Sequence, residues 1–137
     1  MATDTLVENL ERDGAKLIEQ LSHDGFEVTA AFWLQASESG KLYFYIASPV
    51  VEKEGLAPAY RRLHTAIRRM PQPFRIDPMT VTLIGENDRL TKTAVKYRSL
   101  PANIATRYNL NEFGGVGVES VFIYPEDIST WIKANGW

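Results

Sequence analysis

The stretch FEVTAAFWLQASESGKLYFYIA (residues 26–47) places large apolar side chains at every second position on both sides of a polar centre. Phe32 and Leu34 precede the centre, and Leu42 and Phe44 follow it. A period of two is typical of strands, and two such runs around a polar connection predict a β-hairpin. If both apolar sets share one face of the sheet, Phe32 lies opposite Phe44, and the connection has an odd number of residues. Leu34 then lies opposite Leu42.

Apolar side chains recur at helical spacing on both sides of this hairpin. Residues 6–21 and residues 56–70 each present one apolar stripe, which predicts an amphipathic helix in each segment. Thr5 and Glu8 fit a capping box at the start of the first helix, and Gly25 stands where a left-handed residue would end it.

The rest of the chain predicts further elements: a strand at 80–84, a helix ending near Arg98, a connection from Pro101 with a short strand near 105–108, a strand at 116–124, and a last helix after Pro125. The order is α-β-β-α-β-α-(β)-β-α, without the strict alternation of a doubly wound fold. We therefore predict one α+β domain over residues 1–137, with two layers: a mainly antiparallel sheet of about four to five strands and covering helices.

Composition excludes several classes of protein. The 137 residues include no cysteine, which excludes disulfides, cysteine–zinc sites and thiolate catalysis. No apolar run reaches the ~18 residues of a membrane span, and residues 1–4 lack the pattern of a secretory signal. We therefore expect a cytoplasmic protein that binds no membrane.

Charge is unevenly distributed along the chain, although the net charge is only −2. Residues 1–54 carry a net charge of −6, residues 55–110 carry +7, and residues 111–137 carry −3. A basic middle segment is typical of an anion-binding face, and equally of segments that pair with one another in the fold. We put the second interpretation first.

The basic middle segment contains a clear surface feature. At about 100° per residue, four arginines fall in one sector of the helix at 56–70, opposite its apolar stripe: Arg61, Arg62, Arg68 and Arg69. Arginine matches carboxylate and phosphate geometry, so one interpretation is an anionic partner, which could be nucleic acid, a nucleotide or an acidic protein. The other is a solvated face, or salt bridges to the acidic first helix, and we favour it because exposed helix faces are routinely charged. A pI near 5.7 argues against a dedicated nucleic-acid binder.

Three aromatic side chains fall on the second face of the predicted hairpin: Trp33, Tyr43 and Tyr45. Trp33 is expected opposite Tyr43. We consider, in this order, that the chain's own helices cover this face, that it forms a homodimer interface, and that it is a stacking platform for a ligand.

Catalytic and metal-binding motifs are missing from the sequence. The two histidines, His23 and His64, stand apart from any metal-ligand spacing, and we expect no metal and no cofactor. His64, beside the arginines, is the one candidate for a general acid or base. The glycines at 114–117 precede a strand rather than a helix, which favours a turn over a phosphate loop.

Four segments, FWL (32–34), SGKLYFYIASP (39–49), AYRR (59–62) and VFIYP (121–125), together resemble small hypothetical bacterial proteins. The resemblance implies a bacterial origin and no particular activity. From the residues we predict a binding or protein-interaction module with a basic helix suited to an anionic partner. The alternatives are a homodimeric protein that uses the aromatic hairpin face, and a small enzyme that acts on an anionic substrate near His64.

Overall fold

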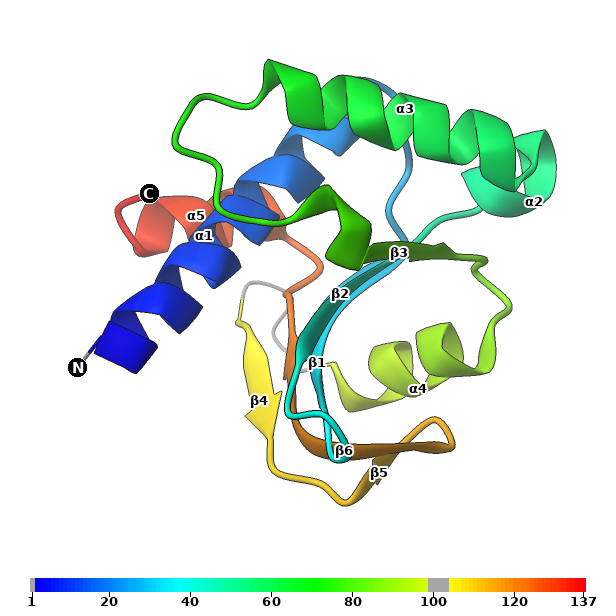
Figure 1. Cartoon of the computed structure of the whole chain (residues 1–137). Helices are drawn as coiled ribbons and strands as arrows, with labels where there is room; N and C mark the ends of the chain where they lie inside the picture. The colour runs from blue at the N-terminus through cyan, green and yellow to red at the C-terminus, as the bar shows by residue number, and fades with distance from the viewer. Residues whose placement is uncertain (1, 99–103) are drawn as a thin grey trace.

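The computed structural model describes residues 2–98 and 104–137, and the start of the predicted connection after Pro101 lies outside these residues. Within them the chain forms helices and a twisted sheet (Figure 1). The helices are α1 (Ala2–His23), α2 (Val50–Glu54), α3 (Leu56–Arg69), α4 (Arg89–Tyr97) and α5 (Ile128–Ala134). The strands are β1 (Ala30–Ala36), β2 (Leu42–Ala47), β3 (Val81–Ile84), β4 (Thr106–Tyr108), β5 (Glu112–Phe113) and β6 (Val116–Ile123), and a short 3-10 helix (Pro78–Thr80) leads into β3.

The strand order of the sheet is β3-β2-β1-β6-β4, and β5 pairs with β6 off this path. Among the described strands, β2 and β3 run parallel and the other pairs are antiparallel. The predicted α+β class, with helices layered on a mainly antiparallel sheet, is confirmed. The predicted glycine turn is also confirmed, because residues 114–115 join β5 to β6 where Phe113 pairs with Val116.

The register of the β1–β2 hairpin differs from the predicted one. Trp33 lies opposite Phe44 and Phe32 lies opposite Tyr45, so the predicted pairings are wrong by one residue. The rings of each pair stack, with centroids 4.7 Å and 5.3 Å apart respectively. Residues 36–41 lie between Gln35 and Leu42, the last pair of the hairpin, and they are an even number rather than an odd one. The prediction assumed that one face of the hairpin is apolar, whereas both faces are buried, so the apolar pattern does not select a register.

Each face of the sheet has its own apolar core. Helices α1, α3 and α5 cover one face, where Trp33, Phe44 and Tyr124 are buried. Helix α4 and the β5–β6 hairpin cover the other, where Phe32 and Ile123 are buried. The main helical layer therefore consists of α1, α3 and α5, and the candidate sites lie on its outer side.

Helix α1 approaches the sheet closely at Gly14. A Cβ atom at this position would overlap the hydroxyl oxygen of Tyr124 and lie 3.2 Å from both Phe44 Cζ and Trp33 Nε1. That hydroxyl donates to the Glu11 carbonyl oxygen (2.6 Å) and accepts from Trp33 Nε1 (2.9 Å). The absence of a side chain at Gly14 thus lets the buried hydroxyl of Tyr124, the residue directly after β6, join α1 to β1.

The ends of α1 were predicted with mixed success. The helix begins at Ala2, so the predicted capping box at Thr5 is wrong and Thr5 lies inside the helix. The predicted end is confirmed: Gly25 has a φ of +80°. The amide of Phe26 donates to the Leu21 carbonyl oxygen (2.9 Å), as expected when a left-handed residue closes a helix.

Helix α3 follows the predicted apolar stripe, with Ala59, Leu63 and Ala66 buried against the sheet. The hydroxyl of Tyr60 accepts a hydrogen bond from the amide of Leu83 in strand β3 (3.0 Å). This contact joins α3 to the edge strand of the sheet, and the buried stripe turns the arginines away from the sheet.

Candidate functional site

The arginine face is the outward side of α3, formed by Arg61, Arg62, Thr65, Arg68 and Arg69. Arg61, Arg68 and Arg69 are exposed, and Arg62 is partly buried. No acidic residue occurs in α3, so the helix itself does not neutralise this face. Arg61, Arg62 and Arg69 line one hollow together with Thr65, and Arg68 donates a hydrogen bond to Thr65.

Two of the arginines are held by acidic residues from neighbouring segments. Arg62 Nη1 donates to Glu54 Oε2 in α2 (2.6 Å), and its guanidinium lies 5.3 Å from the centre of the Phe26 ring. Arg69 Nη1 lies 3.4 Å from the carboxylate of Asp24, directly after α1. Salt bridges to the acidic first helix were predicted, whereas Glu54 belongs to α2 and Asp24 lies just after α1, and the two pairs involve only half of the arginines.

The other two arginines have no carboxylate within ion-pair distance in the described part of the chain. Arg68 Nη2 donates to the Thr65 hydroxyl (3.2 Å), which in turn donates to the Arg61 carbonyl oxygen (2.9 Å). Arg61 lines a shallow hollow of about 360 Å³ together with Arg62 and Arg69, and the carboxylates of Asp24 and Glu54 also line it. The surface thus combines arginines that are oriented by acids with arginines that remain available.

The three aromatic residues predicted to share one face do not do so. Trp33 is only 5% exposed and lies beneath α1. Tyr43 and Tyr45 pair with Leu34 and Phe32 on the opposite face and are partly buried. The predicted pairing of Trp33 with Tyr43 is therefore wrong, and the exposed Trp33 that the dimer hypothesis requires is not present.

His64 lies exposed on α3, with its ring centre 6.1 Å from that of Tyr60. No described side chain forms a hydrogen bond or ion pair with it. Nothing in its surroundings therefore prepares the imidazole for proton transfer, and the enzyme alternative stays a hypothesis.

Sequence reasoning missed a charged pair between α1 and β4, in which Glu11 is buried and Arg107 is exposed. Arg107 Nη2 donates to Glu11 Oε2 (2.5 Å), and the guanidinium lies 4.7 Å from the centre of the Phe122 ring. Burial raises the pKa of Glu11, and the guanidinium of Arg107 opposes this effect. Burial also raises the pKa of Tyr124 well above its ordinary value. The one sign of this pair in the sequence was the carboxylate of Glu11, which lies between Val7 and Gly14 on the apolar side of α1.

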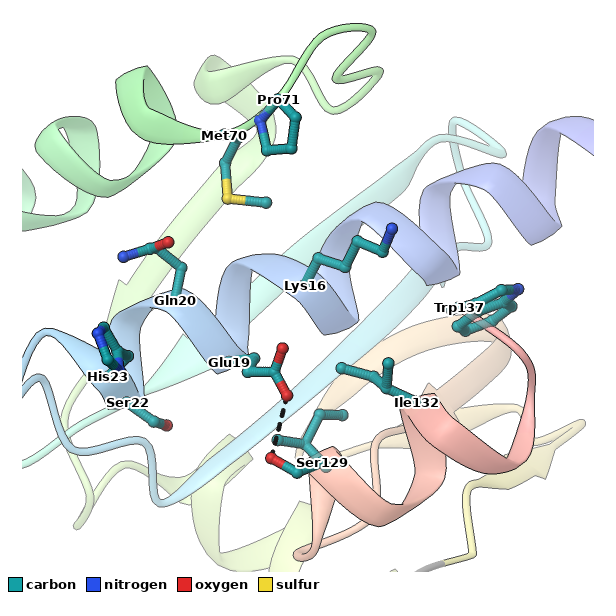
Figure 2. A pocket seen from close by; sticks show the side chains of 11 residues that line it. Lys16, Glu19, Gln20, Ser22, His23, Met70, Pro71, Ser129, Ile132 and Trp137 are labelled. Carbon is teal, nitrogen blue, oxygen red and sulfur yellow. Dashed lines mark hydrogen bonds between the residues drawn. The ribbon is translucent and has the colours of Figure 1, made fainter.

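Sequence reasoning also missed a groove of about 680 Å³ on the outer side of α1 (Figure 2). Lys16 and His23 project from α1 into it, Met70 and Pro71 after α3 form one wall, and α5 forms the other. The groove arises where the ends of three helices meet, which no local pattern predicts.

Comparisons with known proteins identify no relative: no family model matches the chain, and neither the curated proteins nor the solved structures contain a match. In the part of the chain that the structure describes, no helix is long and apolar enough to cross a membrane. Among the same residues, no three His, Asp or Glu side chains gather closely enough to hold a metal ion.

Proposed function

We propose that the chain is a binding module that docks its arginine face against an acidic protein surface. The observation that carries the proposal is that the four arginines of α3 fall into two kinds. Arg62 and Arg69 are oriented by acids, while Arg61 and Arg68 are exposed and have no described carboxylate partner. Exposed guanidinium groups on a helix can form bidentate hydrogen bonds with the carboxylates of a partner, and no internal ion pair has to break first.

An acidic protein fits this surface better than nucleic acid does. The carboxylates of Asp24 and Glu54 line the same hollow as the arginines, so a continuous chain of phosphates would meet two fixed negative charges. A folded partner can place discrete carboxylates opposite Arg61 and Arg68 and avoid these acids. The seven-residue spacing of the two arginines corresponds to about 10 Å along a helix, so one partner helix can present acids to both.

The test compares two double variants that each remove two positive charges. Arg61→Gln/Arg68→Gln changes the arginine face, and Lys92→Gln/Lys96→Gln changes exposed lysines of α4, which packs on the other face of the sheet. The probe is a dye-labelled decaglutamate peptide, followed by fluorescence anisotropy. Wild-type binding is expected to weaken between about 50 mM and about 500 mM salt, because exposed charges are screened.

The arginine variant is expected to bind the peptide at least about tenfold more weakly than wild type, and the lysine variant about as well. Circular dichroism checks that both variants fold. Equal losses in the two variants would mean that net charge alone attracts the peptide, which would refute the proposal. Tighter binding of a labelled oligothymidylate than of the peptide would favour the nucleic-acid alternative instead.

A further inference from the structure

A second surface, separate from the arginine face, lies along the outer side of α1. The groove of Figure 2 continues towards the start of α1 as a second hollow of about 320 Å³. Four residues line both hollows: Lys16, Met70, Pro71 and Trp137. We call this set the waist. The groove of about 680 Å³ falls within the range of about 300–1,000 Å³ that is typical of small-molecule sites.

The indole of Trp137 is held in place as one wall of the waist. Gly136 has a φ of +72°, which favours glycine. The amides of Gly136 and Trp137 donate to the carbonyl oxygens of Lys133 and Ile132, both at 3.1 Å. The Trp137 ring also meets the Trp131 ring edge-to-face, with centroids 5.1 Å apart. Backbone and ring contacts therefore fix the indole before any ligand binds.

The positive charge at the waist is not neutralised, whereas the nearby acids are engaged. Within residues 2–98 and 104–137, no carboxylate lies within ion-pair distance of the Lys16 ammonium. Glu19 accepts a hydrogen bond from the Ser129 hydroxyl (3.1 Å). Asp13 accepts from the amide of Arg75 (2.8 Å). An anion that enters the waist therefore meets an available ammonium group, while Glu19 and Asp13 each have one oxygen held by a hydrogen-bond donor.

We propose that the waist binds a small planar aromatic carboxylate. Its ring lies against Trp137 and the apolar surface of Met70 and Pro71, and its carboxylate pairs with Lys16. In Figure 2 the Lys16 side chain lies between Met70 and Pro71 on one side and Ile132 and Trp137 on the other, so a ring at the waist brings an attached carboxylate within its reach. Aromatic contact and a charge-assisted hydrogen bond then act on the same ligand.

Calorimetric titration with 2-naphthoate and with its neutral analogue 2-naphthamide tests both halves of this proposal. Wild-type protein is expected to bind one naphthoate per chain, at least about tenfold more tightly than the amide, because the charged contact is lost in the amide. Trp137→Leu is expected to weaken both probes, since the aromatic wall is lost.

Lys16→Gln is expected to lower the affinity for naphthoate about tenfold and to leave that for naphthamide within about twofold. Lys133→Gln is the matched control, because Lys133 is exposed on α5 and lines neither hollow. No saturable binding of naphthoate would overturn the proposal. Equal affinity for the two probes would also overturn it and indicate an apolar surface for another protein. An equal loss in Lys133→Gln would overturn it as non-specific attraction.

Discussion

Replacing Gly14 by alanine is expected to destabilise the protein, although alanine is the better helix former. The new methyl group would overlap the Tyr124 hydroxyl oxygen, which is buried between α1 and the sheet. To make room, either α1 moves outward or the Tyr124 ring shifts. Both movements disturb the hydrogen bonds that the hydroxyl makes with Glu11 and Trp33.

The expected magnitude follows from three contributions. Overfilling a packed core costs about 1–3 kcal/mol. The two hydrogen bonds of the hydroxyl contribute about 0.5–1.5 kcal/mol each. Replacing glycine by alanine inside a helix returns about 1 kcal/mol. The free energy of unfolding is therefore expected to fall by about 1–5 kcal/mol, which lowers the melting temperature of a chain of this length by about 3–5 °C for each kcal/mol.

A double-mutant cycle measured by urea denaturation isolates the cause. In a Tyr124→Phe background the overlapping oxygen is gone, and the nearest remaining atoms, in Phe44 and Trp33, lie 3.2 Å from the new methyl group. Small shifts accommodate this distance, so Gly14→Ala is expected to cost less than about 1 kcal/mol there, or to stabilise the chain. An equal cost in both backgrounds would refute the argument, as would a stabilised Gly14→Ala single variant.

Three further predictions concern the buried groups. Phe44→Ala is expected to lower the free energy of unfolding by about 3–5 kcal/mol in chemical denaturation, because the ring is fully buried and stacks on Trp33; a loss under about 1 kcal/mol would contradict this packing. Burial raises the pKa of Glu11, so the folded chain holds this proton more tightly than the unfolded chain, and stability falls as pH rises from the unfolded pKa to the folded one. Glu11→Gln is expected to remove that fall in stability. Denaturation curves of wild type and Glu11→Gln across this pH interval test it, and the same pH dependence of the free energy of unfolding in both proteins would contradict the prediction. Burial likewise raises the pKa of Tyr124, so stability is expected to fall as pH rises above about 10. The difference in ultraviolet absorbance between wild type and Tyr124→Phe should then show the Tyr124 phenolate only as the chain unfolds, and its appearance in folded protein would contradict the burial.

Helices with one apolar side could be predicted from spacing alone, and the hairpin register could not. In α3 the stripe of Leu63 and its neighbours has polar residues opposite, so only one orientation buries it. In the hairpin, Phe32 and Trp33 are adjacent, large and both buried, on opposite faces. Alternation reports which face is buried only when the other face is polar. One face is covered by α1, α3 and α5 and the other by α4 and the β5–β6 hairpin, so alternation within the hairpin cannot select between the two registers.

The candidate sites show the same limit. The clustering of Arg61, Arg62, Arg68 and Arg69 could be predicted because all four lie on one helix. Their partners could not, since Asp24 lies 45 residues before Arg69. Glu11 and Arg107 form an ion pair although they lie 96 residues apart, and the sequence indicates this pair only by placing a carboxylate within the apolar stripe of the first helix. Contacts across the fold depend on how helices are placed on the sheet, and periodicity carries no information about that placement.

The hydrogen bond from Leu83 to Tyr60 has a consequence for how the protein behaves in concentrated solution. An edge strand with free amides is a template onto which a strand from another molecule can add, and such addition starts aggregation. The tyrosine hydroxyl occupies one of these amides, so an incoming strand would have to displace the Tyr60 side chain to pair along β3. The hydroxyl that joins α3 to the sheet therefore also blocks one of the amides at which the sheet could grow beyond β3.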